Sequence, residues 1–119
     1  MQGHVFAAYT PLGETQGATG TIRYIWASVQ SFSEEQGVIK LVSGTSLPVA
    51  IHLSATGEAL KVLRFEAPRD GNLYGPDIRR LFPKDVQTKI FNKQGLDTQE
   101  LDQENRRQAE TYFTSRQGK

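Results

Sequence analysis

Few side chains in this sequence have types and spacings that could do chemistry. The two histidines, His4 and His52, show neither the H-x-H nor the H-x-x-x-H spacing that zinc sites use. The absence of cysteine excludes disulfides, Cys-ligated zinc and thiol nucleophiles. Ser46 follows a glycine-containing turn but lacks the G-x-S-x-G pattern of a nucleophilic serine. We therefore expect no catalytic residue, no metal and no cofactor.

Carboxylates are more numerous, and several flank the point where strand-like sequence gives way to helix-like sequence. Glu66, Asp70 and Asp77 lie there among basic side chains and a tyrosine, namely Arg64, Arg69, Arg79 and Tyr74. Two converging carboxylates could serve as general acid and base in a hydrolase. The alternative is that Asp–Arg hydrogen bonds stabilise this corner, and we favour that structural interpretation.

The overall charge is nearly balanced. The chain carries 14 Lys and Arg against 13 Asp and Glu, a net charge of +1, which argues against a nucleic-acid partner. Residues 61–93 nevertheless hold eight basic and four acidic side chains. Such a basic side suits an anionic lipid, a cell-wall polymer or an acidic partner, although it is more often a solvated helix face. No apolar stretch approaches the roughly 18 residues of a spanning helix, so no membrane span is predicted.

The hydrophobic pattern predicts a sheet followed by helices. Alternating apolar and β-branched residues indicate strands at 4–9, 21–31, 37–43, 48–54 and 59–66, whereas the turn-forming residues of 10–21 are typical of a loop. Helix-period residues predict helices near 76–82, from 84 to a break at Gly95, and from a cap at Asp97 or Thr98 to about 115. We expect a single α+β domain over 1–119. Its antiparallel sheet of about five strands (about 4–66) is followed by two or three C-terminal helices (about 75–115) packed on one face.

The expected core draws on large apolar residues from both parts of the chain. It consists of Trp26, Ile25, Val29, Leu41, Ile51, Leu53, Leu63, Phe65, Ile78, Phe82 and Ile90. Burying each side chain contributes roughly 1.5–3 kcal/mol, so a core of this size needs neither disulfide nor metal.

The corner between sheet and helices carries the most distinctive motif. Segment 63–82, LRFEAPRDGNLYGPDIRRLF, resembles part of an uncharacterised family of bacterial secreted proteins and lipoproteins, a domain also appended to membrane-anchored zinc-peptidase antibiotic sensors. The matching residues are Phe65, Pro68, Arg69, Asp70, Gly71, Tyr74, Ile78, Arg79, Phe82 and Pro83. The similarity runs from about Tyr24 to Phe113 and implies an extracytoplasmic location. There is no peptidase motif, so peptidase activity is not carried over. Neither a signal peptide nor a lipid-anchor cysteine opens the chain, and we expect any anchor to lie in a segment absent from it.

Two classes of function follow. The leading hypothesis is a non-catalytic extracytoplasmic binding or sensing module for a protein or cell-envelope ligand, with Arg69, Asp70, Tyr74 and Arg79 as binding residues. The alternative is a small hydrolase or isomerase that uses Asp70, Glu66 or His52 as acid or base in a sheet-lined pocket. The sequence indicates neither the ligand nor an oligomeric state.

Overall fold

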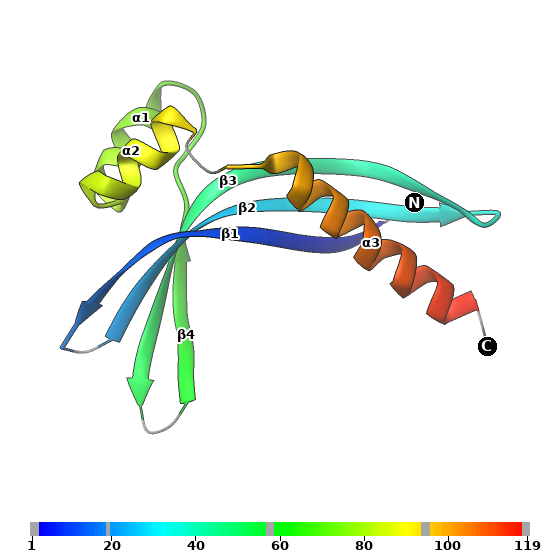
Figure 1. Cartoon of the computed structure of the whole chain (residues 1–119), viewed down its shortest axis with the longest axis horizontal. Coiled ribbons are helices and arrows are strands. Elements are labelled where there is room, and N and C mark those ends of the chain that lie inside the picture. The colour runs from blue at the N-terminus through cyan, green and yellow to red at the C-terminus, as the bar shows by residue number, and fades with distance from the viewer. Residues whose placement is uncertain (1–2, 19, 57–58, 94–95, 118–119) are drawn as a thin grey trace. The chain divides into compact units, whose positions relative to one another are not determined.

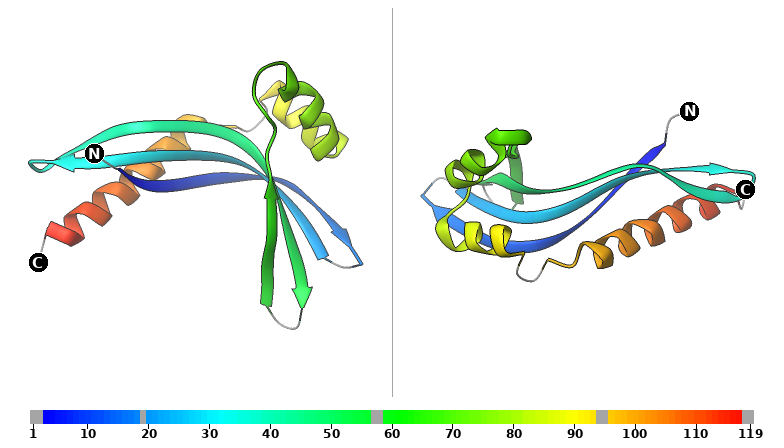
Figure 2. Two further views of the ribbon diagram at one scale, coloured as in Figure 1. Left: turned by 180° about the vertical axis from the view of Figure 1, so that it is seen from behind. Right: turned by 90° about the horizontal axis from the view of Figure 1, so that it is seen from above.

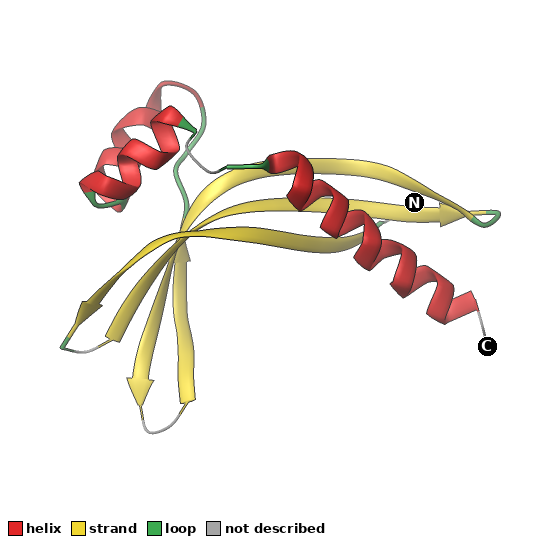
Figure 3. Cartoon of the chain, in the orientation of Figure 1, coloured by secondary structure: helices red, strands yellow, loops and turns green. Residues whose placement is uncertain are grey.

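A computed structural model describes residues 3–18, 20–56, 59–93 and 96–117 and gives an α+β architecture (Figure 1). In this part of the chain one antiparallel sheet of four strands, in the order β1-β2-β3-β4, is followed by helices (Figure 3). The strands are β1 (His4–Gly17), β2 (Gly20–Glu35), β3 (Val38–Thr56) and β4 (Ala59–Glu66). The helices are the short 3₁₀ helix η1 (Gly71–Leu73), α1 (Tyr74–Leu81), α2 (Lys84–Asn92) and α3 (Thr98–Gln117).

The contacts divide the chain into two compact units, which are described separately. The α3 unit consists of the described residues of 1–9, 27–46 and 97–119, and the α1–α2 unit consists of those of 10–26 and 47–96. The first three strands each contribute residues to both units. Among the described residues no helix is both long enough and apolar enough to cross a membrane.

In the α3 unit, helix α3 packs on the sheet (Figures 1 and 2). Phe6 of β1, Phe32 of β2 and Ala109 of α3 are buried together, with partly buried Ile39, Tyr112 and Phe113 packed against them. Ala109 has almost no side chain, so the helix backbone can approach the strands closely. The N–H of Glu100 donates to Asp97 Oδ1 at 3.0 Å, so Asp97, one of the two predicted candidates, is the N-terminal cap.

In the α1–α2 unit, the two short helices provide several of the most deeply buried apolar side chains. Ile78, Val86 and Ile90 are at most 2% exposed, and the Phe82 ring lies 5.6 Å from that of Tyr24. Pro83 separates α1 from α2, as predicted. Helix α2 ends before the expected break, because Lys93 adopts a left-handed conformation (φ 56°) and its N–H donates to Ile90 O.

The predicted number of five strands was slightly wrong, because the expected loop at 44–46 is extended backbone that joins two predicted strands into β3; the expected loop at 10–21 is also mostly extended and lengthens β1 and β2. Gly44 is explained by a close approach, because a Cβ there would lie 3.1 Å from Gln30 Cγ. Pro11 is tolerated because β1 is an edge strand, where a missing N–H interrupts no ladder on the open side.

The predicted core was only partly correct. Trp26, Leu53, Ile78, Phe82 and Ile90 are buried, and Ile25, Val29 and Ile51 are partly buried. By contrast, Leu41, Leu63 and Phe65 are 53%, 58% and 67% exposed. Two of these three belong to β4, the last strand of the sheet, whose register joins it to β3 from Ala50↔Glu66 to Thr56↔Ala59. An apolar strand pattern predicts a strand but does not tell whether another layer covers it.

Candidate functional site

The predicted corner is built around the carboxylate of Asp77, in the first turn of α1. Arg69 donates to it from Nε (2.8 Å) and from its backbone N–H (2.9 Å), both to Oδ2, and from Nη2 to Oδ1 (3.0 Å). Arg80 Nη2 lies 3.3 Å from Oδ1. These charge-assisted hydrogen bonds hold the pKa of the Asp77 carboxyl well below its usual range, and the same contact raises the pKa of Arg69. The arrangement ties the chain after β4 to the start of α1.

The other proposed binding residues surround this ion pair without converging on it. Asp70 is exposed and makes no side-chain cap on η1. Tyr74, the first residue of α1, is half-buried, and its burial raises the pKa of the phenol. The Arg79 guanidinium lies over the Phe91 ring, 5.4 Å from its centroid. Of these four binding residues, Arg69 alone forms a hydrogen-bonded ion pair with another described residue, Asp77.

Much of the basic side predicted from the sequence is used within the fold. Lys89 Nζ donates to Leu12 O at 2.8 Å, and Lys93 Nζ lies 5.4 Å from the centre of the Trp26 ring. Arg79 and Arg80 also contact other side chains of the fold, so several of these basic residues interact with groups of the protein itself. Lys84, at the start of α2, is exposed.

The acid–base residues of the alternative hypothesis come together in part. His52 Nε2 and Glu66 Oε1 lie 2.6 Å apart, with their side chains 15% and 35% exposed. The β3–β4 register places Arg64 opposite His52, and Arg64 Nε is 4.0 Å from the same Glu66 oxygen. The carboxylate thus orients the imidazole through its Nε2 nitrogen. Asp70, the third candidate, is an exposed residue at the start of η1.

A polar cluster that the sequence analysis missed lies under α3. The Asn105 amide, which is fully buried, donates from Nδ2 to Ser28 O (3.0 Å), Ser28 Oγ (3.3 Å) and Gln30 Oε1 (3.1 Å). Ser28 Oγ in turn donates to Asp102 Oδ1 at 2.5 Å. Among the described residues, the buried Asn105 Oδ1 has no hydrogen-bond partner. We call Ser28, Gln30, Asp102 and Asn105 the polar cluster.

A signal for the polar cluster is present in the sequence. In α3, Leu101, Asn105 and Ala109 follow one another at intervals of four, so a polar residue interrupts the apolar stripe that faces the sheet. In β2, Ser28 and Gln30 likewise separate Trp26 from Phe32 on one face of the strand. Two polar gaps in two otherwise apolar faces predict that the faces meet there, because buried polar groups need one another.

Beside the polar cluster lies a hollow of about 270 Å³ between β2, β3 and the first turns of α3. We call it the polar hollow. It is lined by six residues of polar type, Ser28, Gln30, Thr45, Ser46, Thr98 and Asp102, and by Leu41 and Gly44, and apolar atoms make up the larger part of its surface. Three of the four members of the polar cluster therefore also line the hollow, with their positions already set by hydrogen bonds.

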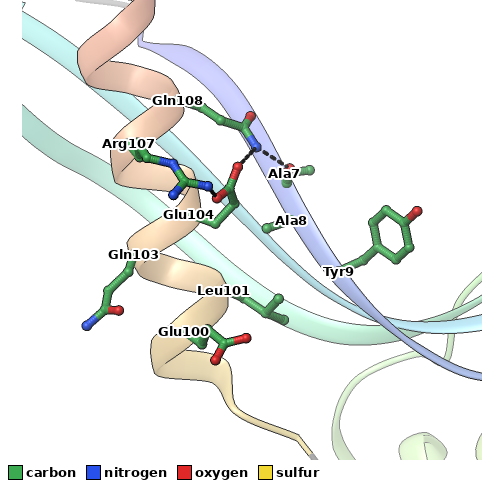
Figure 4. A pocket seen from close by; sticks show the side chains of 9 residues that line it. All are labelled: Ala7, Ala8, Tyr9, Glu100, Leu101, Gln103, Glu104, Arg107 and Gln108. Atoms are coloured by element: carbon green, nitrogen blue, oxygen red, sulfur yellow. Dashed lines mark hydrogen bonds and ion pairs between the residues drawn. The ribbon is translucent and has the colours of Figure 1, made fainter.

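A larger groove of about 540 Å³ runs between β1 and α3 (Figure 4). Three of its polar side chains interact with one another, since Glu104 forms an ion pair with Arg107 and accepts a hydrogen bond from Gln108 Nε2 at 3.1 Å. Gln108 Nε2 also reaches Ala7 O at 3.4 Å. Tyr9 also lines this groove, and Figure 4 shows its ring on the side of β1 that is away from α3.

Neither a metal site among the described residues nor a known relative points to a function. Within the described ranges, no group of three or more His, Asp or Glu side chains is placed to hold a metal ion. No family model, no curated protein and no solved structure matches this chain.

Proposed function

We propose that this protein is a non-catalytic binding module, and the polar hollow carries the proposal. The fully buried Asn105 donates hydrogen bonds to Ser28 and Gln30, and Ser28 in turn donates to Asp102, so three of the lining side chains are held in place. Side chains whose positions are already fixed lose little conformational entropy when a ligand binds, so the entropic cost of binding is smaller. The same arrangement offers hydrogen bonds at the surface and a rigid support beneath it.

We also propose that the module works outside the cytoplasm, as a secreted or lipoprotein-like domain that binds or senses a protein or a cell-envelope ligand. The support is the resemblance of segment 63–82 to the bacterial family described above. Arg69, Asp70, Tyr74 and Arg79 remain proposed contacts for such a partner. The Arg69 side chain is 63% exposed despite its ion pair, so part of its guanidinium still faces solvent.

The location is tested by fractionating the cells that naturally produce the protein and determining its mature N-terminus by mass spectrometry. We expect the protein outside the cytoplasm, with a processed or lipid-modified start. Recovery of an unprocessed cytoplasmic protein that begins at Met1 would contradict the extracytoplasmic proposal and leave the ligand-binding proposal to be judged separately.

A second candidate function, the small hydrolase or isomerase, is favoured by the 2.6 Å contact between His52 and Glu66. In this hypothesis Glu66 orients the imidazole at Nε2, and Nδ1 accepts a proton from water or substrate. We expect any turnover of chromogenic esters, phosphates or glycosides to fall about tenfold or more in His52→Gln, since general-base catalysis contributes at least that much. Equal turnover in wild type and His52→Gln, with the fold intact by circular dichroism, would remove this candidate.

A further inference from the structure

We propose that the polar hollow binds a small neutral polyol, such as one sugar unit. The inference rests on the proposed binding function and names the chemical class of the ligand. It is argued from the hydrogen-bonding capacity, the charge and the rigidity of the hollow.

The lining offers both donors and acceptors after its internal hydrogen bonds are made. Gln30 Oε1 accepts from Asn105, which leaves Gln30 Nε2 to donate. Asp102 Oδ1 accepts from Ser28, which leaves Asp102 Oδ2 to accept. The hydroxyls of Thr45 and Ser46 can do either. Sugar hydroxyls are the small ligand groups that both donate and accept, so they match this mixture.

The cluster itself also has more acceptors than donors. Asn105 Oδ1 is buried and has no partner among the described residues, but Asn105 lies beneath the hollow and does not line it, whereas Asp102 does and keeps Oδ2 as an acceptor beside its bond to Ser28. Unsatisfied buried polar atoms are rare in proteins and call for a donor from water or from a ligand. A ligand that brings O–H or N–H groups to this hollow can therefore donate to Asp102 Oδ2.

The charge of the lining residues distinguishes between neutral, cationic and anionic ligands that carry such donors. Of the described residues that line the hollow, Asp102 is the only charged one, so the hollow disfavours phosphate and other anions. A cationic amine would meet a single carboxylate, one oxygen of which already accepts from Ser28. Leu41, 53% exposed, adds an apolar flank of the kind that the C–H face of a sugar covers.

The test is a titration followed by the backbone amide signals of residues 44–46 and 98–102 in nitrogen-15 NMR spectra. The neutral probes are glucose, galactose, N-acetylglucosamine and inositol, and the charged probes are ethanolamine and inorganic phosphate. The test variant combines Thr45→Val with Ser46→Ala. Its matched control is Ser43→Ala, on the same strand, because Ser43 does not line the polar hollow but an adjoining one that shares Gln30, Gly44 and Thr45 with it. Ser43, Thr45 and Ser46 are all exposed, so these changes spare the buried core.

We expect at least one neutral probe to shift these amides, with binding about tenfold weaker in the double variant and unchanged in Ser43→Ala, because two hydrogen bonds are lost. Shifts caused only by ethanolamine or phosphate would overturn the polyol assignment while leaving the binding function standing. No shift of these amides by any probe would overturn the polar hollow as a site. Binding of the neutral probes that is equal in all variants would overturn it as well.

Discussion

Replacing Asp77 with Asn is expected to lower the melting temperature by about 10 °C, because it breaks an ion pair whose acidic partner is buried. The Asp77 side chain is 3% exposed and accepts three hydrogen bonds from Arg69 and one from Arg80. The amide removes the charge and points a donor group at two guanidinium ions. Differential scanning calorimetry gives the measurement, with Asp85→Asn as control. Asp85 lies in the first turn of α2, as Asp77 does in α1, but is exposed.

The same pair makes an acid-dependent contribution whose sign follows from the depressed pKa of Asp77. The carboxyl stays ionised in the folded protein at pH values where the unfolded chain, with a pKa of about 3.9, takes up a proton. The stabilisation is therefore complete above about pH 4 and is lost as the pH falls toward the folded-state pKa. We expect the stability difference between wild type and Asp77→Asn to narrow below about pH 4. An Asp77→Asn variant with the same melting temperature as the wild type at neutral pH would contradict the role assigned to Asp77.

Replacing Asn105 with Asp is expected to lower the free energy of unfolding by roughly 3–5 kcal/mol at neutral pH, because it buries an unpaired charge. The variant removes the Nδ2 donor to Ser28 and Gln30 and places a carboxylate oxygen against their acceptors. Asn105→Ala loses the same hydrogen bonds without adding a charge, so its loss should be smaller, roughly 2 kcal/mol. Urea unfolding of both variants, with the exposed Gln103→Ala as control, measures the difference.

Acidity gives an independent check on Asn105→Asp. Burial raises the pKa of a new carboxyl above its value in the unfolded chain, so the destabilisation should shrink as the pH falls through that raised value. The asparagine and alanine proteins should show no such difference from each other. An Asn105→Asp protein as stable as the wild type across the neutral range would mean that α3 is not seated on Ser28 and Gln30.

Local signals in the sequence predicted the helical part of the fold well. The Asp97 cap, Pro83 between two helices and the apolar spacing of Ile78, Phe82 and Ile90 are short-range features, and each has the predicted structural role. The Asp–Arg interpretation of the corner is confirmed for Arg69 and Asp77, because a turn brings residues eight apart into contact.

The errors arose where tertiary contacts decide. Gly44 was interpreted as part of a loop, but it continues β3 beside the Gln30 side chain, a contact between neighbouring strands. Leu63 and Phe65 form a strand as predicted and remain exposed, because strand pattern carries no information about the next layer. The polar cluster joins Ser28 to Asn105 across 77 positions of sequence, and recognising it required pairing two faces that no local rule connects.

The hydrogen bond from Gln108 to the Ala7 carbonyl affects how the protein resists aggregation. Ala7 belongs to β1, an edge strand whose backbone groups would otherwise be open to pairing with another chain. Arg106, also on α3, donates to the carbonyl of Ile39 in β3 at 3.2 Å. Side chains of helix α3 therefore donate hydrogen bonds to backbone carbonyls on two strands, β1 and β3. A mutation that weakens the packing of α3 should therefore lead to strand-to-strand association between molecules before the sheet itself unfolds. The helix thus maintains the solubility of the protein as well as its fold.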